Sequence, residues 1–184
     1  MHGYDAKDMA RSFRTVRENT IKVAEDIPED RYGFRPGEGS RSAAETLAHI
    51  AVTPRWPRQL HGDRLTAVDF SMFGTVFARL VQAEGELAKC TKAQILDALR
   101  SGGEEFGSWL ETLTDEVLAE QVNFPPPVQP SSKTRFEMLL STKEHEMHHR
   151  SQLMVIERMV GIVPHLTREM QARFAQMQQA TAKA

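Results

Sequence analysis

Apolar residues recur at helical spacing along nearly the whole chain, and no stretch alternates convincingly with a period of two. A repeat of three and four residues is typical of amphipathic helices, whereas alternation is typical of strands. The long runs lie at about 9–27, 42–54, 91–113 and 134–161, with a shorter run at 70–80 and a terminal one at 166–181. We therefore expect an all-α protein, built as a four-helix bundle with a short crossover helix and an extra C-terminal helix.

Three of these helices begin with a capping box, in which a Ser or Thr is followed three residues later by Glu or Gln. The pairs are Ser42 with Glu45, Thr91 with Gln94, and Thr134 with Glu137. Between the helices we expect loops at 28–41 and 123–133, and a polar turn at 58–66. We expect Gly102 and Gly103 to weaken or kink the third long helix, because glycine is a poor helix former.

Length and composition favour one domain over 1–184, with the bundle at about 5–163 and a helix and tail at 164–184. The net charge is −2, from 23 basic and 25 acidic side chains. Such a chain has no strong positive field, so we expect no binding to nucleic acid. No run approaches the length of a membrane span, and the N-terminus has no apolar signal-peptide core. The expectation is a soluble cytoplasmic protein without membrane contact.

Any metal site must use histidine or carboxylate ligands, because Cys90 is the only cysteine. His145 and His149 are four residues apart, so their rings would lie on one face of a helix, one turn apart. That face also bears apolar residues such as Ile156, so the pair points inward. Two neutral imidazoles so placed can bind one ion such as zinc or nickel. Hydrogen-bonded core histidines are the alternative.

A third ligand must come from elsewhere in the chain. His49 stands one turn after Glu45 on the second long helix, on a side that suits a cavity between helices. The remaining histidines are weaker candidates, because His148 lies beside the ligand face and the others are expected in loops or at the terminus: His2, His61 and His165.

Two segments resemble the DinB/YfiT-like family of metal-dependent proteins. They are RSAAETLAHI at 41–50 and HEMHHRSQL at 145–153, and the similarity in order and spacing extends from about residue 5 to residue 163. The resemblance implies a four-helix bundle, often dimeric, with a divalent metal bound by His49, His145 and His149. Relatives with known reactions include transferases of low-molecular-weight thiols and a thiol-dependent isomerase.

Three neutral histidines would leave the ion its full double charge and an open fourth position, where a bound water or thiol loses its proton more easily. The expected function is therefore a metal-dependent enzyme acting on a small molecule, with thiol S-transfer as the leading reaction and hydrolysis behind it. Glu45 and Gln152 could orient an imidazole or hold water. Glu45 could equally serve only as the capping partner of Ser42.

Segment 145–149 also fits the H-E-x-x-H pattern of zinc proteases, with Glu146 as the general base and Glu169 as a third ligand. The missing strand signals and the break at Gly161 count against this alternative. A further alternative is a metal-binding stress-response protein without catalysis. A substrate pocket would favour an enzyme, and three aromatic residues could line one or merely pack: Trp56, Phe70 and Phe73.

A second apolar stripe runs along the last bundle helix, roughly opposite the two histidines. Its residues are Phe136, Leu140, Met147 and Met154. A helix that is apolar on two opposed faces must be covered on both. We expect a homodimer with Met147 and Met154 at or near the contact, or else a cover formed by the terminal helix at 166–181.

Overall fold

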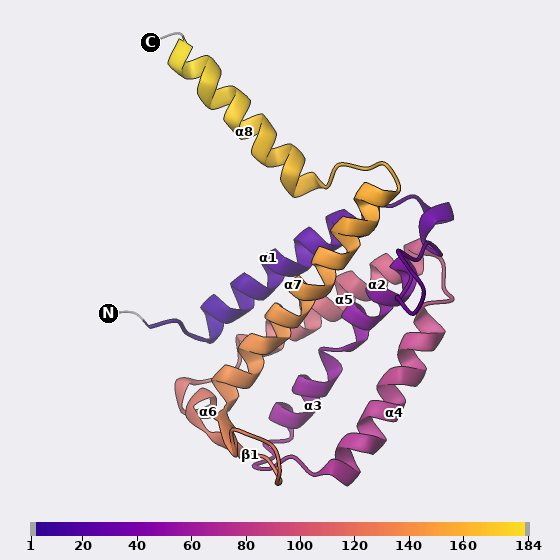
Figure 1. The fold of residues 1–184 in the computed structure, drawn as a ribbon. Coiled ribbons are helices and arrows are strands. Elements are labelled where there is room, and N and C mark those ends of the chain that lie inside the picture. Colours follow the sequence, from indigo (N-terminus) through magenta and orange to yellow (C-terminus); the bar gives the residue numbers. More distant parts are fainter. Residues whose placement is uncertain (1–2, 183–184) are drawn as a thin grey trace.

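The computed structural model describes residues 3–182 and contains the expected four-helix bundle (Figure 1). The bundle helices are α1 (Ala6–Asp26), α2 (Ala43–Val52), α5 (Lys92–Leu110) and α7 (Arg135–Met159). Helices α1 and α2 each pack against both α5 and α7, so the four enclose a common core. The other helices are α3 (Arg55–Gly62), α4 (Phe70–Leu87), α6 (Asp115–Ala119) and α8 (His165–Ala182), with a 3-10 turn, η1, at Glu29–Arg31.

The capping signals mark the start of all three helices, and two of them form complete boxes. Ser42 Oγ accepts from the Glu45 amide at 3.2 Å, and the Glu45 carboxylate accepts from the Ser42 amide at 2.8 Å. Thr91 and Gln94 exchange the same two bonds. At the start of α7 the hydroxyl bond is present, but the Glu137 carboxylate pairs with Lys133 instead.

Segment 55–87 is more helical than expected. The turn expected at 58–66 is wrong over most of its length, because α3 reaches Gly62. Pro57 is tolerated there since it stands in the first turn, where its missing amide has no intrahelical acceptor to lose. Helix α4 continues to Leu87 rather than ending near residue 80, and it runs beside α2. This extra length brings Glu84 alongside α2.

A small sheet interrupts the loop expected at 123–133. Strands β1 (Gln121–Asn123) and β2 (Ser132–Thr134) pair antiparallel, with Gln121 opposite Thr134. Three residues are too few for a strand to show an alternating pattern in the sequence. The proline-rich segment between the strands is a loop, as expected.

Helix α5 runs through Gly102 and Gly103 without interruption. A Cβ atom on Gly103 would lie 2.7 Å from Cγ of Arg17 on α1. Arg17 is buried there, and its guanidinium donates to the Leu99 carbonyl at 2.8 Å and to the Glu146 carboxylate at 2.9 Å. The glycine therefore allows α1 and α5 to approach closely around a buried arginine.

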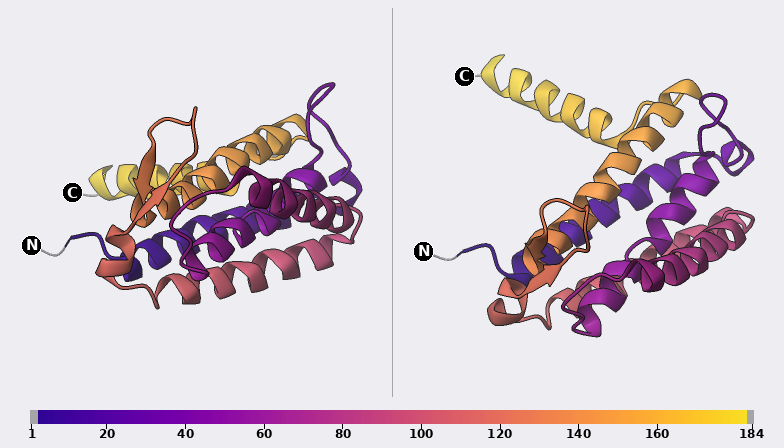
Figure 2. Two further views of the ribbon diagram at one scale, coloured as in Figure 1. Left: turned by 90° about the horizontal axis from the view of Figure 1, so that it is seen from below. Right: turned by 60° about the horizontal axis from the view of Figure 1, so that its bottom comes forward.

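Helix α8 projects away from the bundle (Figure 1 and Figure 2). Gly161, with φ of +86°, ends α7, and Arg168 on α8 pairs with Asp26 on α1 at 2.7 Å. In this position α8 does not cover the second apolar stripe of α7. Most of that stripe packs partly buried on the chain's own core, whereas Met147 is 40% exposed. None of the helices between residues 3 and 182 combines the length and apolar character of a membrane span.

Candidate metal centre

His49 on α2 meets His145 and His149 on α7. The Nε2 atom of His145 lies 3.1 Å from Nε2 of His49 and 3.1 Å from Nε2 of His149. One nitrogen from each of the three rings falls within 4.8 Å of the other two, a spacing that could hold one metal ion. Two helices supply this centre because α2 and α7 are neighbours in the bundle and the two α7 histidines are one turn apart.

Oxygen acceptors fix the orientation of two of the rings. Nδ1 of His49 lies 2.7 Å from a carboxylate oxygen of Glu84, and Nδ1 of His149 lies 2.9 Å from the amide oxygen of Gln152. Since these oxygens can only accept, each Nδ1 carries the proton and donates it. The unprotonated Nε2 atoms of His49 and His149 therefore face the centre, as metal ligation requires.

The chemistry of this donor set fits a cation. Nε2 of His145 can donate to only one of its two neighbours, so at least one inward lone pair has no proton to accept among the three rings. An ion between them would satisfy all three lone pairs at once. His49, His145 and His149 are thus the residues that could hold a metal.

Burial keeps the rings uncharged. It is the main reason that the pKa of His49 and of His145 falls to about 4. Neighbouring positive charges, including that of Arg41, lower both pKa values by smaller amounts. Burial also lowers the pKa of His149, whereas the hydrogen bond that its Nδ1 donates to Gln152 raises it. Neutral imidazole is the form that binds metal, so at neutral pH the rings need to lose no proton first.

The two residues proposed to support the histidines behave differently. Gln152 does hold His149. Glu45 does not reach the rings, because one carboxylate oxygen accepts from Ser42 and the other pairs with Arg35. Glu84 was missed by the sequence reasoning: it lies 35 positions from His49, beyond the expected end of its helix, so no spacing rule connects the two.

The zinc-protease alternative fails on geometry. Glu146 points away from the three rings and is buried against Arg17, with Nε of Arg17 2.9 Å from its carboxylate. Glu169 pairs with Lys22 on α1 at 3.7 Å. Neither carboxylate belongs to the three-histidine group, so the general base and the third ligand of that pattern are both missing here.

The other histidines among residues 3–182 stand outside this group. His148 is exposed beside Gln152. His61 lies on α3 and His165 begins α8, so both are in helices rather than in the expected loops. His2 lies outside the described residues.

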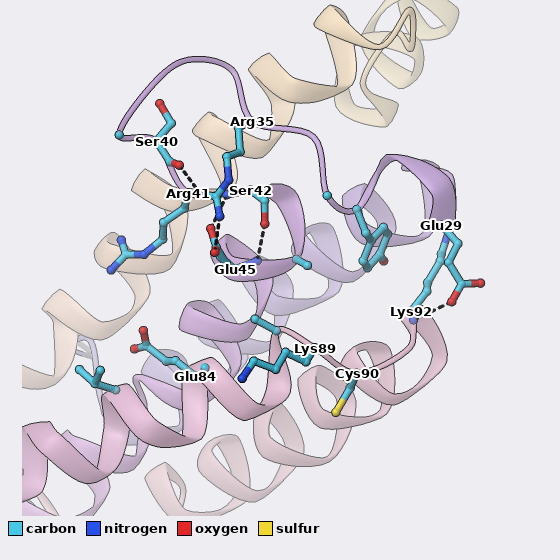
Figure 3. Close-up of a pocket in the computed structure, with 17 residues that line it drawn as sticks. Glu29, Arg35, Ser40, Arg41, Ser42, Glu45, Glu84, Lys89, Cys90 and Lys92 are labelled. Atoms are coloured by element: carbon cyan, nitrogen blue, oxygen red, sulfur yellow. Dashed lines mark hydrogen bonds and ion pairs between the residues drawn. The ribbon is translucent and has the colours of Figure 1, made fainter.

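Two cavities lie near the centre, one with Glu84 in its wall and the other with His145. The larger, of about 610 Å³, lies between the loop before α2 and the end of α4, and its walls include Glu84, Arg41, Lys89 and Cys90. Figure 3 shows Arg41 on the loop at one side of the cavity, and Glu84, Lys89 and Cys90 along the end of α4 at the other. None of the three histidines lines this cavity.

The smaller cavity, of about 320 Å³, includes His145 in its wall and lies between α3 and α7. Trp56 lines it, as the sequence suggested, and Phe73 packs edge-on against Trp56 with ring centres 5.1 Å apart. Phe70 is 54% exposed and does not line it. Most of the remaining wall is apolar, so this space suits an apolar compound next to the centre.

Comparison with known proteins agrees with this architecture. Uncharacterized protein YjoA of Bacillus subtilis (strain 168) is 27% identical over 153 residues, which cover 81% of this chain and 86% of YjoA. The crystal structure of YjoA, described as a DinB-like protein, matches with a TM-score of 0.61 at 24% identity, over 83% of this chain and 92% of that one. YfiT from Bacillus subtilis matches with a TM-score of 0.64 at 15% identity, over 88% and 91% of the two chains.

YfiT is described as a probable metal-dependent hydrolase with an unusual four-helix bundle topology, and at this identity the likeness shows the fold alone. The DinB superfamily model matches residues 12–153, which include most of the bundle and all three clustered histidines. The chain therefore belongs to the DinB superfamily.

Proposed function

We propose that this protein is a metal-dependent enzyme in which His49, His145 and His149 bind one divalent ion. The observation that carries the proposal is the convergence of three neutral imidazoles whose inward lone pairs cannot all be satisfied by one another. Zinc and nickel are the ions we expect, because both accept imidazole ligands readily. When bound, the ion would supply a positive charge that makes a coordinated thiol or water easier to deprotonate.

The leading reaction we propose is transfer of a low-molecular-weight thiol to an electrophilic small molecule. Two cavities of different character support a reaction with two substrates. The larger offers Arg41 and Lys89 to a polar, anionic thiol, and the smaller offers an apolar wall to the electrophile. The proposed setting is the cytoplasm, where thiols are kept reduced.

Hydrolysis is the second candidate, and the description of YfiT as a probable metal-dependent hydrolase favours it. A hydrolase needs water as its nucleophile, so the larger cavity would have no thiol to bind. Replacing Arg41 by Ala would then leave turnover unchanged, whereas thiol transfer should lose apparent affinity for the thiol.

The test has two stages. The first is elemental analysis of protein purified without added metal, where about one zinc or nickel per chain supports the proposal. The second is a screen of the loaded protein against model electrophiles, with and without thiols. Product formation that needs a thiol supports transfer, and product formation in water alone supports hydrolysis. A metal-loaded protein without either activity would support a binding protein.

We also infer that the protein acts as a homodimer. Helix α8 stands away from the bundle and exposes Met170, Phe174 and Met177, which are 53%, 57% and 63% exposed. Met147 on α7 is also exposed, whereas Met154 packs partly against the chain's own core. An apolar face of this kind is most simply covered by a second copy of the chain.

A further inference from the structure

Helix α4 lies against the metal centre but is held weakly by the rest of the chain. It has 18 residues, and Val76 is the only one of its described side chains that is buried. Helix α2, against which it packs, has only 10 residues and buries eight of them. A segment with few buried apolar side chains opens at a low free-energy cost. We therefore expect α4 to open more readily than the bundle helices.

Helix α4 also has little stability of its own. Gly74 and Gly85 stand inside it, and a Cβ atom at either position would meet nothing within 4 Å, so close packing requires neither glycine. Glycine is a poor helix former, and short isolated helices are marginal in water even when they are rich in alanine. Helix α4 should therefore lose its helical hydrogen bonds when it leaves the bundle.

One polar contact joins α4 to the bundle. Among the described residues, Glu84 is the only residue of α4 whose side chain forms a hydrogen bond with another helix, and its partner is Nδ1 of His49 at 2.7 Å. The same ring contributes to the three-histidine group. An ion on Nε2 would make the Nδ1–H of this ring a stronger donor to the carboxylate. Metal binding and the docking of α4 are thus coupled, and such coupling acts equally in both directions.

The position of α4 affects both cavities. Val81, Glu84 and Gly85 form part of the wall of the larger one, and Figure 3 shows Glu84 on this side. Phe73 packs against Trp56, which lines the smaller one. Departure of α4 would therefore open the larger cavity, release Trp56 and expose the His49 ring in a single motion.

We infer that α4 is a movable cover of the metal centre, which opens to admit the ion and closes when the ion binds His49. Glu84 transmits metal binding to the helix. For the ion this rests on the proposed function, whereas the opening of α4 in the metal-free protein and its dependence on Glu84 do not. An orienting contact of this kind changes metal affinity about 10–100-fold, so the ion should stabilise the closed helix by the same factor.

Hydrogen exchange followed by mass spectrometry tests this inference, because exchange of an amide reports local opening. In the metal-free protein the amides of 70–87 should exchange faster than those of α1, α5 and α7. Saturating zinc should slow the exchange of the α4 amides by up to about 100-fold. Metal analysis of the same samples shows whether zinc is bound.

Glu84→Ala removes the contact between the two helices. Without metal, its α4 amides should exchange about 10-fold faster than in the wild-type protein, as expected for loss of one hydrogen bond to a carboxylate. With saturating zinc their exchange should not slow. Glu86→Ala is the matched control, because it also replaces a glutamate of α4 by alanine but leaves the His49 contact in place. It should respond to zinc as the wild-type protein does.

Three results would overturn the movable cover and leave the metal proposal standing. They are α4 amides that exchange as slowly as those of the bundle helices without metal, bound zinc that leaves α4 exchange unchanged, and an equal response to zinc in Glu84→Ala and the wild-type protein. Failure of the wild-type protein to bind zinc would overturn both proposals.

Discussion

Glu84 accepts a hydrogen bond from Nδ1 of His49 at 2.7 Å, and this contact ties the crossover helix α4 to the three-histidine centre. The carboxylate holds the ring in the tautomer whose Nε2 lone pair faces inward. Both side chains are mostly shielded from solvent, at 15% and 19% exposure, which strengthens the contact. Helix α4 therefore helps to build the site although it lies outside the bundle proper.

Replacing Glu84 by Ala should weaken metal binding about 10–100-fold, because the His49 ring would lose its orienting acceptor. Competition with a chromophoric chelator measures this change directly. Glu86→Ala is the matched control, because Glu86 lies on the same helix but contacts Gln82 on the exposed side. Equal affinities for the Glu84 variant and the wild-type protein would show that the contact has no role in ligation.

Single replacements of His49, His145 or His149 by Ala should each remove most of the bound metal, since two imidazoles hold an ion far less well than three. His148→Ala should leave the metal content nearly unchanged, because its ring is exposed and outside the cluster. Metal analysis of the four purified variants decides the matter. Equal loss from His148→Ala and His145→Ala would refute the assignment of ligands.

Gly102 and Gly103 form a matched pair for a stability test. Gly103→Ala should destabilise the protein by about 1–3 kcal/mol, since its Cβ would lie 2.7 Å from Arg17 Cγ, inside a buried ion pair that cannot easily shift. Gly102→Ala should instead be neutral or stabilising by up to about 1 kcal/mol, because the nearest atom is the Ala51 carbonyl oxygen at 3.7 Å and alanine favours helix. Urea unfolding of both variants measures the two changes, and the same sign for both would contradict this account.

These glycines also show how far the sequence could go. Helix starts and the bundle follow from local patterns, whereas the meeting of His49 with His145 and His149 was expected from the resemblance to the DinB/YfiT-like family. The role of Gly103 could not be predicted, because it depends on the packing of Arg17 against it, and Arg17 stands 86 positions earlier in the chain. Glu84 also acts through a distant partner, and no spacing in a single sequence reports such contacts.

Glu157 should make stability fall as pH rises. Its carboxylate is fully buried without a hydrogen-bond partner among the described residues. Burial raises its pKa to about 7. The negative charge of Asp26 adds to this rise, whereas Arg168 and Arg158 oppose it. Between the unfolded pKa of about 4.5 and this value the native state keeps a proton that the unfolded chain has lost, so native stability decreases through that window.

Replacing Glu157 by Gln removes this titration. We compare the free energy of unfolding of the variant with that of the wild-type protein. The variant's advantage should be about 2–3 kcal/mol larger at pH 8 than at pH 4.5. Urea unfolding at the two pH values gives the comparison, and the histidines titrate alike in both proteins, so they cancel. A difference between variant and wild-type protein that does not change with pH would contradict a buried, neutral Glu157.

The exposed apolar face of α8 leads to the last prediction. Because α8 projects from the bundle and exposes Met170, Phe174 and Met177, a second copy of the chain could cover this face. We expect light scattering at tens of micromolar to give twice the chain mass of 20.8 kDa. Phe174→Glu should shift the mass to that of the monomer, since a charge in the contact would have to be desolvated. Gln179→Glu is the control, because Gln179 lies on the same helix but away from the face of Phe174, and it should leave the dimer intact. A monomer mass for the wild-type protein would refute the dimer, and Phe174→Glu would then improve solubility without changing mass.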